Sequence, residues 1–375
     1  MKKNIVRNLV FLLLIIGFFI FLYFFNNIEK VKLTNKEGIS YEKAVVEEVI
    51  IDNLQEDGSR SGRQTVKVRV LGGEFKGQVI EASSFSGYLY GADCEKGMKV
   101  IINLSISGDD YVASVYGYYR APIIYGFIAF FLFMIWLIGG KKGFKSVIAL
   151  IFTFICIVYL FLPMIYRGYS PFLAAVIISI LITTITMYFI GGFTKKTVSS
   201  ILGTVIGVIV AGLSATVFGY FAKISGNNVA DIEELVFIGT YTNIQVKGIL
   251  FAGILIASLG AVMDVSMSIA STINEIYDKN PNLSRKELFL SGINVGRDMM
   301  GTMSNTLILA FTGGAINTLI LIYAYSMKYN QIINMYSIGI EIMQGISGSL
   351  GIIFTVPLVS LISSILLTSK INKKS

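Results

Sequence analysis

The chain has 375 residues, of which 54% are hydrophobic and only 14% are charged, with a mean hydropathy of +0.71. Soluble domains carry about 25% charged residues, so this balance excludes an ordinary soluble protein and predicts an integral membrane protein. The formal net charge is +8, but the Lys and Arg residues fall largely at the ends of apolar segments, where they set membrane orientation, so no nucleic-acid partner is expected.

The chain contains no histidine, which excludes imidazole metal ligands, histidine proton relays and Ser-His catalysis. The two cysteines, Cys94 and Cys156, lie in different regions, one expected outside the membrane and one inside it. Neither a disulfide nor a metal-ligand cluster follows from that spacing. We therefore expect a protein without a metal or another cofactor.

The N-terminal segment is basic and precedes the apolar run Leu9–Phe25, which is close to the minimum of about 17 residues for a membrane span. A cleaved signal peptide is the rival interpretation. The residues that follow, NNIEKVKL, are bulky and charged and offer no small-residue cleavage site. Residues 1–28 are therefore predicted to form an uncleaved transmembrane anchor.

Residues 29–120 differ from the rest because they are charged, rich in turns and alternating in polarity. Five short segments read as strands separated by Gly, Asn and Asp: AVVEEVII, QTVKVRVL, FKGQVIEA, MKVIINLS and YVASVYGY. Five strands in so short a stretch predict a small closed barrel of the OB or SH3-like kind. We expect it to serve as an extracytoplasmic scaffold or to dock a protein partner.

Residues 121–375 are apolar nearly throughout and predict seven further spans, which gives a mainly α polytopic bundle of about eight transmembrane helices. The spans are roughly residues 123–138, 146–165, 172–190, 198–222, 246–271, 296–323 and 332–367. Basic loops alternate with loops that are acidic or carry few basic residues. The positive-inside rule therefore predicts a multi-pass cell-membrane protein with both termini in the cytoplasm and residues 29–120 extracellular. The acidic loop 225–243 reads either as a short amphipathic helix or as a connector.

Small residues mark places where helices can approach closely. Gly203 and Gly207 form a GxxxG pair, and the last span carries Gly345, Gly348 and Gly351 ahead of Pro357. Close packing is the favoured role, with a gating break as the alternative. Glu341 lies just before this glycine run, where an interfacial position would cost it little.

Two apolar helices between Ile254 and Leu319 carry polar residues at helical spacing. At about 100° per residue, the first helix aligns Asp264, Ser268, Ser271 and Glu275. The second aligns Asn294, Asp298, Gly301, Asn305 and Thr312. An ionised carboxylate in lipid costs at least about 2.5–3.5 kcal/mol, so such stripes normally face a bundle interior or a water-filled path. A short loop joins the helices, and we expect the two stripes to face each other.

The segments GAVMDVSMSIASTINEI, NVGRDMMGTMSNTLILAFTGG and GISGSLGIIFTVPLVS resemble the YibE/F family of bacterial membrane proteins. The resemblance covers the chain from about Ile123 onward and implies a polytopic membrane protein. It implies no activity.

A second resemblance is to the membrane core of the SecD/SecF export subunits, of the resistance–nodulation–division superfamily. Its pattern matches Gly260, Asp264, Ile273, Glu275, Asn305, Thr306 and Leu307. The resemblance implies a proton-coupled membrane machine in which the helix acid relays protons. The much smaller extracytoplasmic part and the helices before Thr197 depart from that pattern.

These sequence features are compatible with two functions. The first is a proton-coupled secondary transporter or membrane energiser of unknown substrate, with a proton-relay group of Asp264, Ser268, Ser271, Glu275, Asp298, Asn305 and Thr306. The second is a non-transport scaffold that presents the barrel to a partner while the stripes serve assembly, which leaves a homo-oligomer open. An enzyme is not expected, because the chain has no histidine and no HExxH or GxSxG motif lies in a span. An aspartate-pair protease would need two facing acids inside the membrane, and in the one pair to consider, Asp264 with Asp298, the second acid is expected too near the membrane edge.

Overall fold

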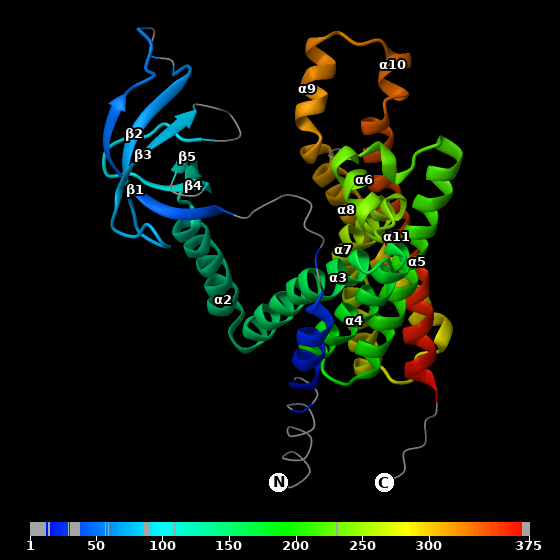
Figure 1. Ribbon diagram of the computed structural model, residues 1–375. Coiled ribbons are helices and arrows are strands. Elements are labelled where there is room, and N and C mark those ends of the chain that lie inside the picture. The colour runs from blue at the N-terminus through cyan, green and yellow to red at the C-terminus, as the bar shows by residue number, and fades with distance from the viewer. Residues whose placement is uncertain are drawn as a thin grey trace. The chain divides into compact units, whose positions relative to one another are not determined.

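The computed structural model describes residues 13, 16–28, 30, 38–56, 58, 60–85, 91–107, 110–229 and 232–369 (Figure 1). The protein is mainly helical, at 69%, with one small five-stranded β-barrel. The chain forms two compact units, one of residues 32–134 and one of residues 1–31 with 135–375. The predicted combination of a helical membrane part and a barrel after the first helix is confirmed at this level.

The barrel consists of five strands, and each overlaps one of the five predicted segments. They are β1 (Ile39–Ile51), β2 (Arg63–Val70), β3 (Val79–Phe85), β4 (Lys99–Ser107) and β5 (Asp110–Tyr118). Strand β3 shares only residues 79–82 with the predicted segment FKGQVIEA. The strand order around the closed barrel is β1-β2-β3-β5-β4, and only the β3–β5 pair is parallel. The long strand β1 pairs with both β2 and β4, and its register shifts after Val46 and Val49, which bends it across the closure.

Alternating residues of these strands fill the barrel interior. The hydrophobic cluster inside the barrel includes the completely buried side chains of Val46, Val66, Val68, Ile102 and Leu104. Because successive strand residues point to opposite faces, the apolar half of each strand lines the core and the charged half meets water. This two-residue period is the signal that made the strands predictable.

A buried glutamine ties strand β2 to the chain before β4. The Gln64 side chain is fully buried and its Nε2 donates to Asp52 Oδ1 at 2.8 Å, while the Cys94 amide donates to Gln64 Oε1 at 2.8 Å. The bond from Gln64, with further bonds from the Asn53 amide and the Arg60 guanidinium, holds the pKa of Asp52 below its ordinary value. Gln64 therefore links a surface carboxylate to the barrel interior.

The remaining elements are mostly apolar helices. They are α2 (Ala121–Cys156), α3 (Leu162–Tyr166), α4 (Pro171–Gly191), α5 (Lys195–Ala222), α6 (Ile232–Tyr241), α7 (Ile249–Lys279), α8 (Arg285–Gly314), α9 (Ile316–Ala324), α10 (Tyr329–Ile333) and α11 (Tyr336–Thr368). The first of them, α2, begins in the unit of residues 32–134 and ends in the other unit. Among the described residues, five helices are long and apolar enough to cross a membrane, or six if the bent pair α8–α9 is one span. The protein is therefore a multi-pass membrane protein.

The difference from the eight expected spans has two local causes. The first apolar run is described as a helix only over Ile16–Asn26, and Leu9–Leu12 of that run lie outside the described residues. The expected spans 123–138 and 146–165 belong to one continuous helical stretch, Ala121–Tyr166, interrupted at Gly140. Gly140 has φ 54° and ψ −131°, a conformation that residues with a Cβ rarely adopt, so it allows the sharp change of direction there.

The helix Ile16–Asn26 is fixed to its own unit at one end. Asn26 Nδ2 donates to the Tyr159 carbonyl at 2.7 Å, and Arg167 Nη2 donates to the Phe25 carbonyl at 2.9 Å. Tyr159 lies in the π-helical turn η1 (Ile157–Phe161) between α2 and α3. A π-turn shifts the regular hydrogen-bond pattern of the helix, and here the Tyr159 carbonyl accepts a bond from a neighbouring helix.

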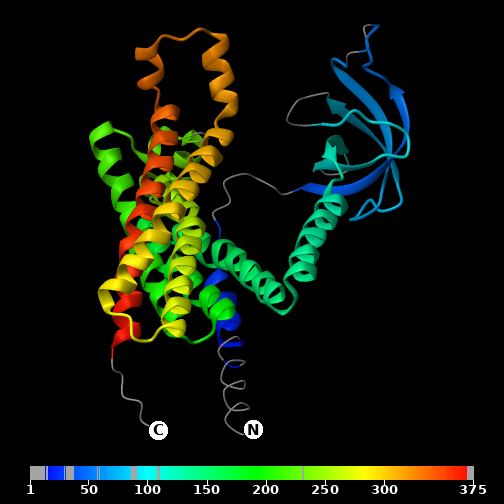
Figure 2. The same ribbon diagram turned by 180° about the vertical axis from the view of Figure 1, so that it is seen from behind.

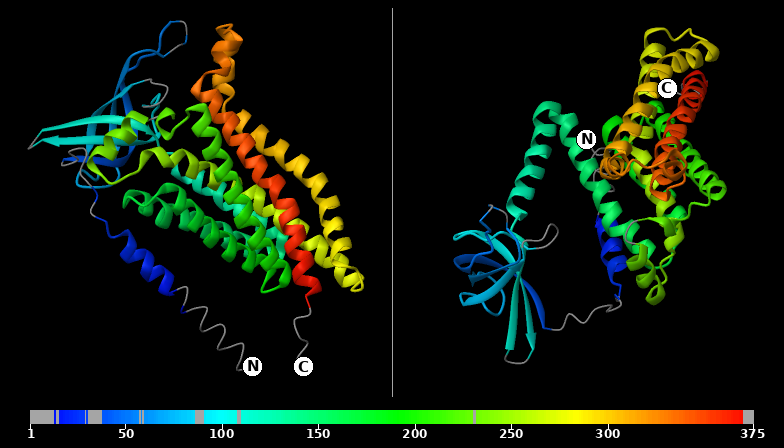
Figure 3. Two further views of the ribbon diagram at one scale, coloured as in Figure 1. Left: turned by 90° about the vertical axis from the view of Figure 1, so that its right-hand side faces the viewer. Right: turned by 90° about the horizontal axis from the view of Figure 1, so that it is seen from above.

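Helix α11 is the centre of the membrane unit and packs on α5, α7 and α8 (Figures 2 and 3). A Cβ at Gly207 would clash with Thr355 on α11, and one at Gly351 would lie 2.8 Å from the Gly207 carbonyl. Both glycine groups predicted to allow close packing lie at this α5–α11 contact or beside it. Helix α11 continues through Pro357 without a break.

Substituting Gln64 tests the polar link in the barrel. In a fragment of residues 32–119, Gln64→Leu should lower the free energy of unfolding at pH 7 by about 1–3 kcal/mol, because the buried Cys94 amide loses its acceptor. The folded-state pKa of Asp52 is depressed, so its contribution is present above the ordinary value of 3.8 and is lost as the pH falls below it. The difference in unfolding free energy between the native fragment and Gln64→Leu should therefore become smaller below that pH. Urea unfolding at several pH values measures it, with exposed Gln78→Leu as the control. A gap that widens in acid would contradict the assignment.

Candidate functional site

The polar stripe of α7 lies on the side of the helix that the described helices leave largely exposed. Residues such as Val262, Ile269 and Ile273 form the buried side, about 140–180° around the helix from Asp264. Asp264 and Glu275 are exposed, whereas Ser268 and Ser271 are half-buried. The same face continues from Asp264 towards the start of the helix through Gly260, Ala257 and Gly253, all exposed. A Cβ at Gly253 or Gly260 would meet open space.

The polar stripe of α8 is uncovered in the same way. Leu288, Gly292, Gly296 and Leu307 form the buried side of α8. A Cβ at Gly292 would lie 2.6 Å from Ile273 of α7 and 2.5 Å from Ser360 of α11. The exposed stripe is on the opposite side and comprises Asn294, Asp298, Gly301, Asn305 and Thr312.

The expectation that the two stripes face each other is wrong for this chain. Gly292 and Gly296 bring α8 against Ile273 and Ile269 of α7, so the apolar faces meet and the polar faces remain uncovered. Small residues allow that close approach, and apolar packing then leaves the charged groups outside the contact. The described residues include no hydrogen bond from Asp264 to Asn305 or Thr306.

The seven predicted relay residues form two uncovered surfaces and no bonded cluster. Asp298, Asn305 and Thr306 are exposed, and the Thr306 hydroxyl donates to the Thr302 carbonyl of its own helix at 2.9 Å. Over the described part of the chain, no ion pair involves Asp264, Glu275 or Asp298. That part also contains no group of three or more acidic or Cys side chains arranged for a metal ion.

Asp264 is the acid placed deepest along an apolar helix. It lies fifteen residues from either end of α7 (264 − 249 and 279 − 264), or about 22 Å along the helix axis. The hydrocarbon core of a membrane is about 30 Å thick, so a carboxyl at the middle of a spanning helix is far from both headgroup layers. Glu275 lies three turns further on, near the end of the helix.

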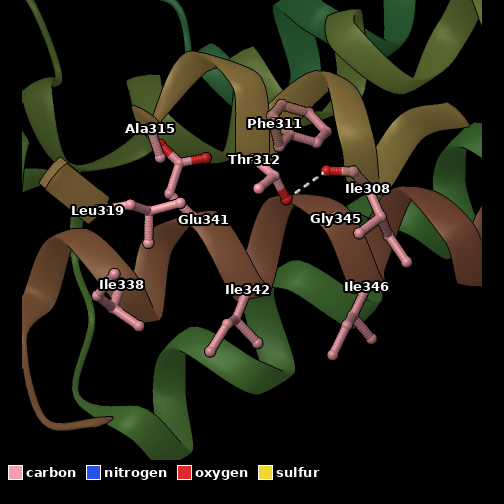
Figure 4. A pocket seen from close by; sticks show the side chains of 10 residues that line it. All are labelled: Ile308, Phe311, Thr312, Ala315, Leu319, Ile338, Glu341, Ile342, Gly345 and Ile346. Carbon is pink, nitrogen blue, oxygen red and sulfur yellow. Dashed lines mark hydrogen bonds between the residues drawn. The ribbon is translucent and has the colours of Figure 1, made fainter. Parts of the chain in front are cut away.

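A second acid occupies a cavity that the sequence did not reveal. Glu341, in the second turn of α11, is half-buried in a cavity of about 370 Å³ beside the break between α8 and α9 (Figure 4). The cavity is lined by Ile308, Phe311, Thr312, Ala315, Leu319, Ile338, Glu341, Ile342, Gly345 and Ile346. Helices α8 and α9 meet at an angle of 62°.

Sequence reasoning gave Glu341 little weight because it counted only its distance from the helix end. The available signals were the Gly313–Gly314 pair, which suggests a break in the preceding span, and the Glu341–Gly345 spacing, which puts the acid beside a residue without a side chain. Thr312 belongs to the α8 stripe and also lines the cavity, so the stripe ends there.

A family model described as YibE/F-like protein matches residues 127–369, more than half of the chain. No curated protein and no solved structure gives a significant match.

The opposed faces of α8 give a matched pair of glycine substitutions. Gly296→Ala places a Cβ against Val356 and Ile269 and should destabilise the membrane unit by about 1–3 kcal/mol through overpacking. Gly301→Ala meets open space and should leave stability level or slightly higher. Thermal unfolding of the purified protein in detergent measures both. Equal losses in the two variants would contradict the assignment of packed and open faces.

Proposed function

The chain belongs to the YibE/F-like family, and from that premise we propose that it is a proton-coupled transporter or membrane energiser in which Asp264 relays the coupling proton. The observation that carries the proposal is a carboxyl group at the middle of an apolar helix, on a face that the described part of the chain leaves exposed. The substrate is not assigned. The SecD/SecF resemblance supports the same role for this acid.

Desolvation explains why an acid in this position suits proton transfer. Burying a carboxylate in hydrocarbon favours its neutral form, whereas contact with water favours the charged form. A change in hydration of the α7 face would therefore drive Asp264 to take up or release a proton. Gly253, Ala257 and Gly260 leave room for water beside the helix, because none of them has a side chain larger than a methyl group.

The remaining polar residues extend the proposed relay along the two helices. Ser268 and Ser271 follow Asp264 at helical spacing and lead to Glu275 near the end of α7. Hydroxyl groups can both donate and accept hydrogen bonds, so they can support a chain of water molecules. On α8, Asp298, Asn305 and Thr306 provide a second polar surface for the same purpose.

A scaffold function is the second candidate, and the uncovered stripes favour it. Exposing a charged helix face to lipid is costly. Binding of another chain over that face would remove the cost and so be favoured. Small residues such as Gly253 and Gly260, with open space beside them, are typical of contacts between membrane helices. In this alternative the stripes bind a second copy or another membrane protein, and the barrel docks a protein partner. Neither candidate invokes enzymatic activity, a metal or a cofactor.

We further propose eight membrane crossings with the barrel outside the cell. The helix that includes Ile16–Asn26 would cross first, Gly140 would separate the second and third crossings, and the α8–α9 pair would form the seventh. The basic loops then lie on the cytoplasmic side together with both termini. The strand order β1-β2-β3-β5-β4 with one parallel pair supports an OB-like assignment for the barrel.

Cysteine labelling tests this topology. The native Cys94 and Cys156 are both buried, so single cysteines at exposed Glu74 and Asn282 can be compared directly. A membrane-impermeant maleimide added to intact cells should label position 74 and not 282, since only the barrel is outside. Labelling after lysis is the control for reactivity. The reverse pattern in intact cells would show the opposite orientation.

Substitution of Asp264 separates the two functions. In proteoliposomes of purified protein, Asp264→Asn should slow the dissipation of an imposed pH gradient on the order of 100-fold, because the amide cannot exchange the relayed proton. Asp278→Asn is the matched control, since that acid lies at the end of α7 and already accepts a bond from Asn274. A pH-sensitive dye inside the vesicles measures the flux. Unchanged flux in Asp264→Asn would exclude the relay and leave the scaffold.

A further inference from the structure

The cavity beside the α8–α9 break combines an apolar wall with a single charge. Nine of its ten lining residues are apolar or carry only a hydroxyl group, and the tenth is Glu341. Its volume of about 370 Å³ falls within the range of about 300–1,000 Å³ typical of small-molecule sites. Figure 4 shows the Glu341 side chain extending from α11 so that its carboxylate lies beside Ala315 at the end of α8, with Thr312 and Phe311 further along that helix.

Glu341 has no partner that would explain its position. Across the part of the chain that the structure describes, its carboxylate makes no hydrogen bond and no ion pair. The nearest hydroxyl in the cavity, on Thr312, donates to the Ile308 carbonyl at 2.8 Å and so satisfies its own helix. A half-buried carboxylate without a partner is costly in an apolar setting, and a bound cation would offset that cost.

We propose that this cavity binds a small organic monocation, an ammonium ion with an apolar tail, whose charged group pairs with Glu341. The tail would lie against Ile308, Ile342 and the ring of Phe311. Binding here does not require a proton relay at Asp264, so the two can fail separately.

Other ligand classes fit the cavity less well. An anion would be repelled by the Glu341 carboxylate. A divalent metal ion needs several oxygen ligands, and the cavity offers a single carboxylate. A purely apolar ligand would leave the carboxylate unpaired.

Two probes of nearly equal shape test the proposal. Hexylammonium and 1-hexanol share the same tail, and only the first is charged. The full-length protein, in nanodiscs of phosphatidylglycerol, should bind hexylammonium measurably by calorimetry. Glu341→Gln should weaken that binding about 10- to 100-fold, because it removes a charge-assisted bond, while hexanol binding stays as it was. Glu341→Asp should retain part of the hexylammonium binding. Equal binding of hexylammonium to the native protein and to Glu341→Gln would overturn the proposal, as would an equal loss for both probes.

Gly345 provides a steric control within the same cavity. A Cβ there would make an ordinary contact of 3.6 Å with Ile308, so Gly345→Ala should retain binding, whereas Gly345→Leu should fill the space and block both probes. Exposed Glu81→Gln in the barrel is the control for loss of a negative charge elsewhere. Binding that survives Gly345→Leu would place the ligand outside the cavity. Loss of hexylammonium binding in phosphatidylethanolamine nanodiscs would assign the site to a lipid headgroup and overturn the proposal of a free ligand.

Discussion

The contact of α5, α7 and α8 with α11 determines which side of α7 and of α8 can carry charged groups. Glycines at the contact, among them Gly207, Gly292 and Gly351, allow backbone and side chains to approach at distances that a Cβ would prevent. In a membrane, apolar burial between helices gains little over lipid, so such close packing is a main source of association. Once these faces are fixed against α11, the acids of α7 and α8 have to lie on the opposite sides.

The chain therefore handles its two notable membrane acids differently. Asp264 lies on an open face at the middle of α7, where hydration or a partner decides its charge. Glu341 lies in a cavity whose walls belong to the chain itself. A helix break produces that cavity, because α8 and α9 diverge by 62° and leave space beside α11. Close helix packing therefore leaves Asp264 on an exposed face. The space beside the α8–α9 break, where helices do not pack closely, holds Glu341.

The sequence predicted the barrel well because alternation along strands is a local signal, and the buried Val46, Val66 and Val68 follow it directly. It also predicted two polar stripes, since helical spacing alone defines them. It could not tell which face of α7 meets α8. That choice depends on how glycines of α8 pack against Ile269 and Ile273 of the neighbouring helix, a tertiary contact that helical spacing does not define. The Glu341 cavity was missed for the same reason, because it requires three separate helix segments to define its walls.

The α8 stripe leads along a single helix to the cavity that holds Glu341. Its members run from Asn294 through Asp298, Gly301 and Asn305 to Thr312, which lines the Glu341 cavity. A helix that is polar along one uncovered face would be a poor lipid-facing element, yet it ends at a break where a cavity holds an unpaired carboxylate. Contact with lipid alone explains neither the polar face of α8 nor the unpaired carboxylate of Glu341. A route for water or a ligand that ends at a binding cavity would require both. For the transport proposal, this arrangement adds a second observation to the one that carries it, the carboxyl group of Asp264.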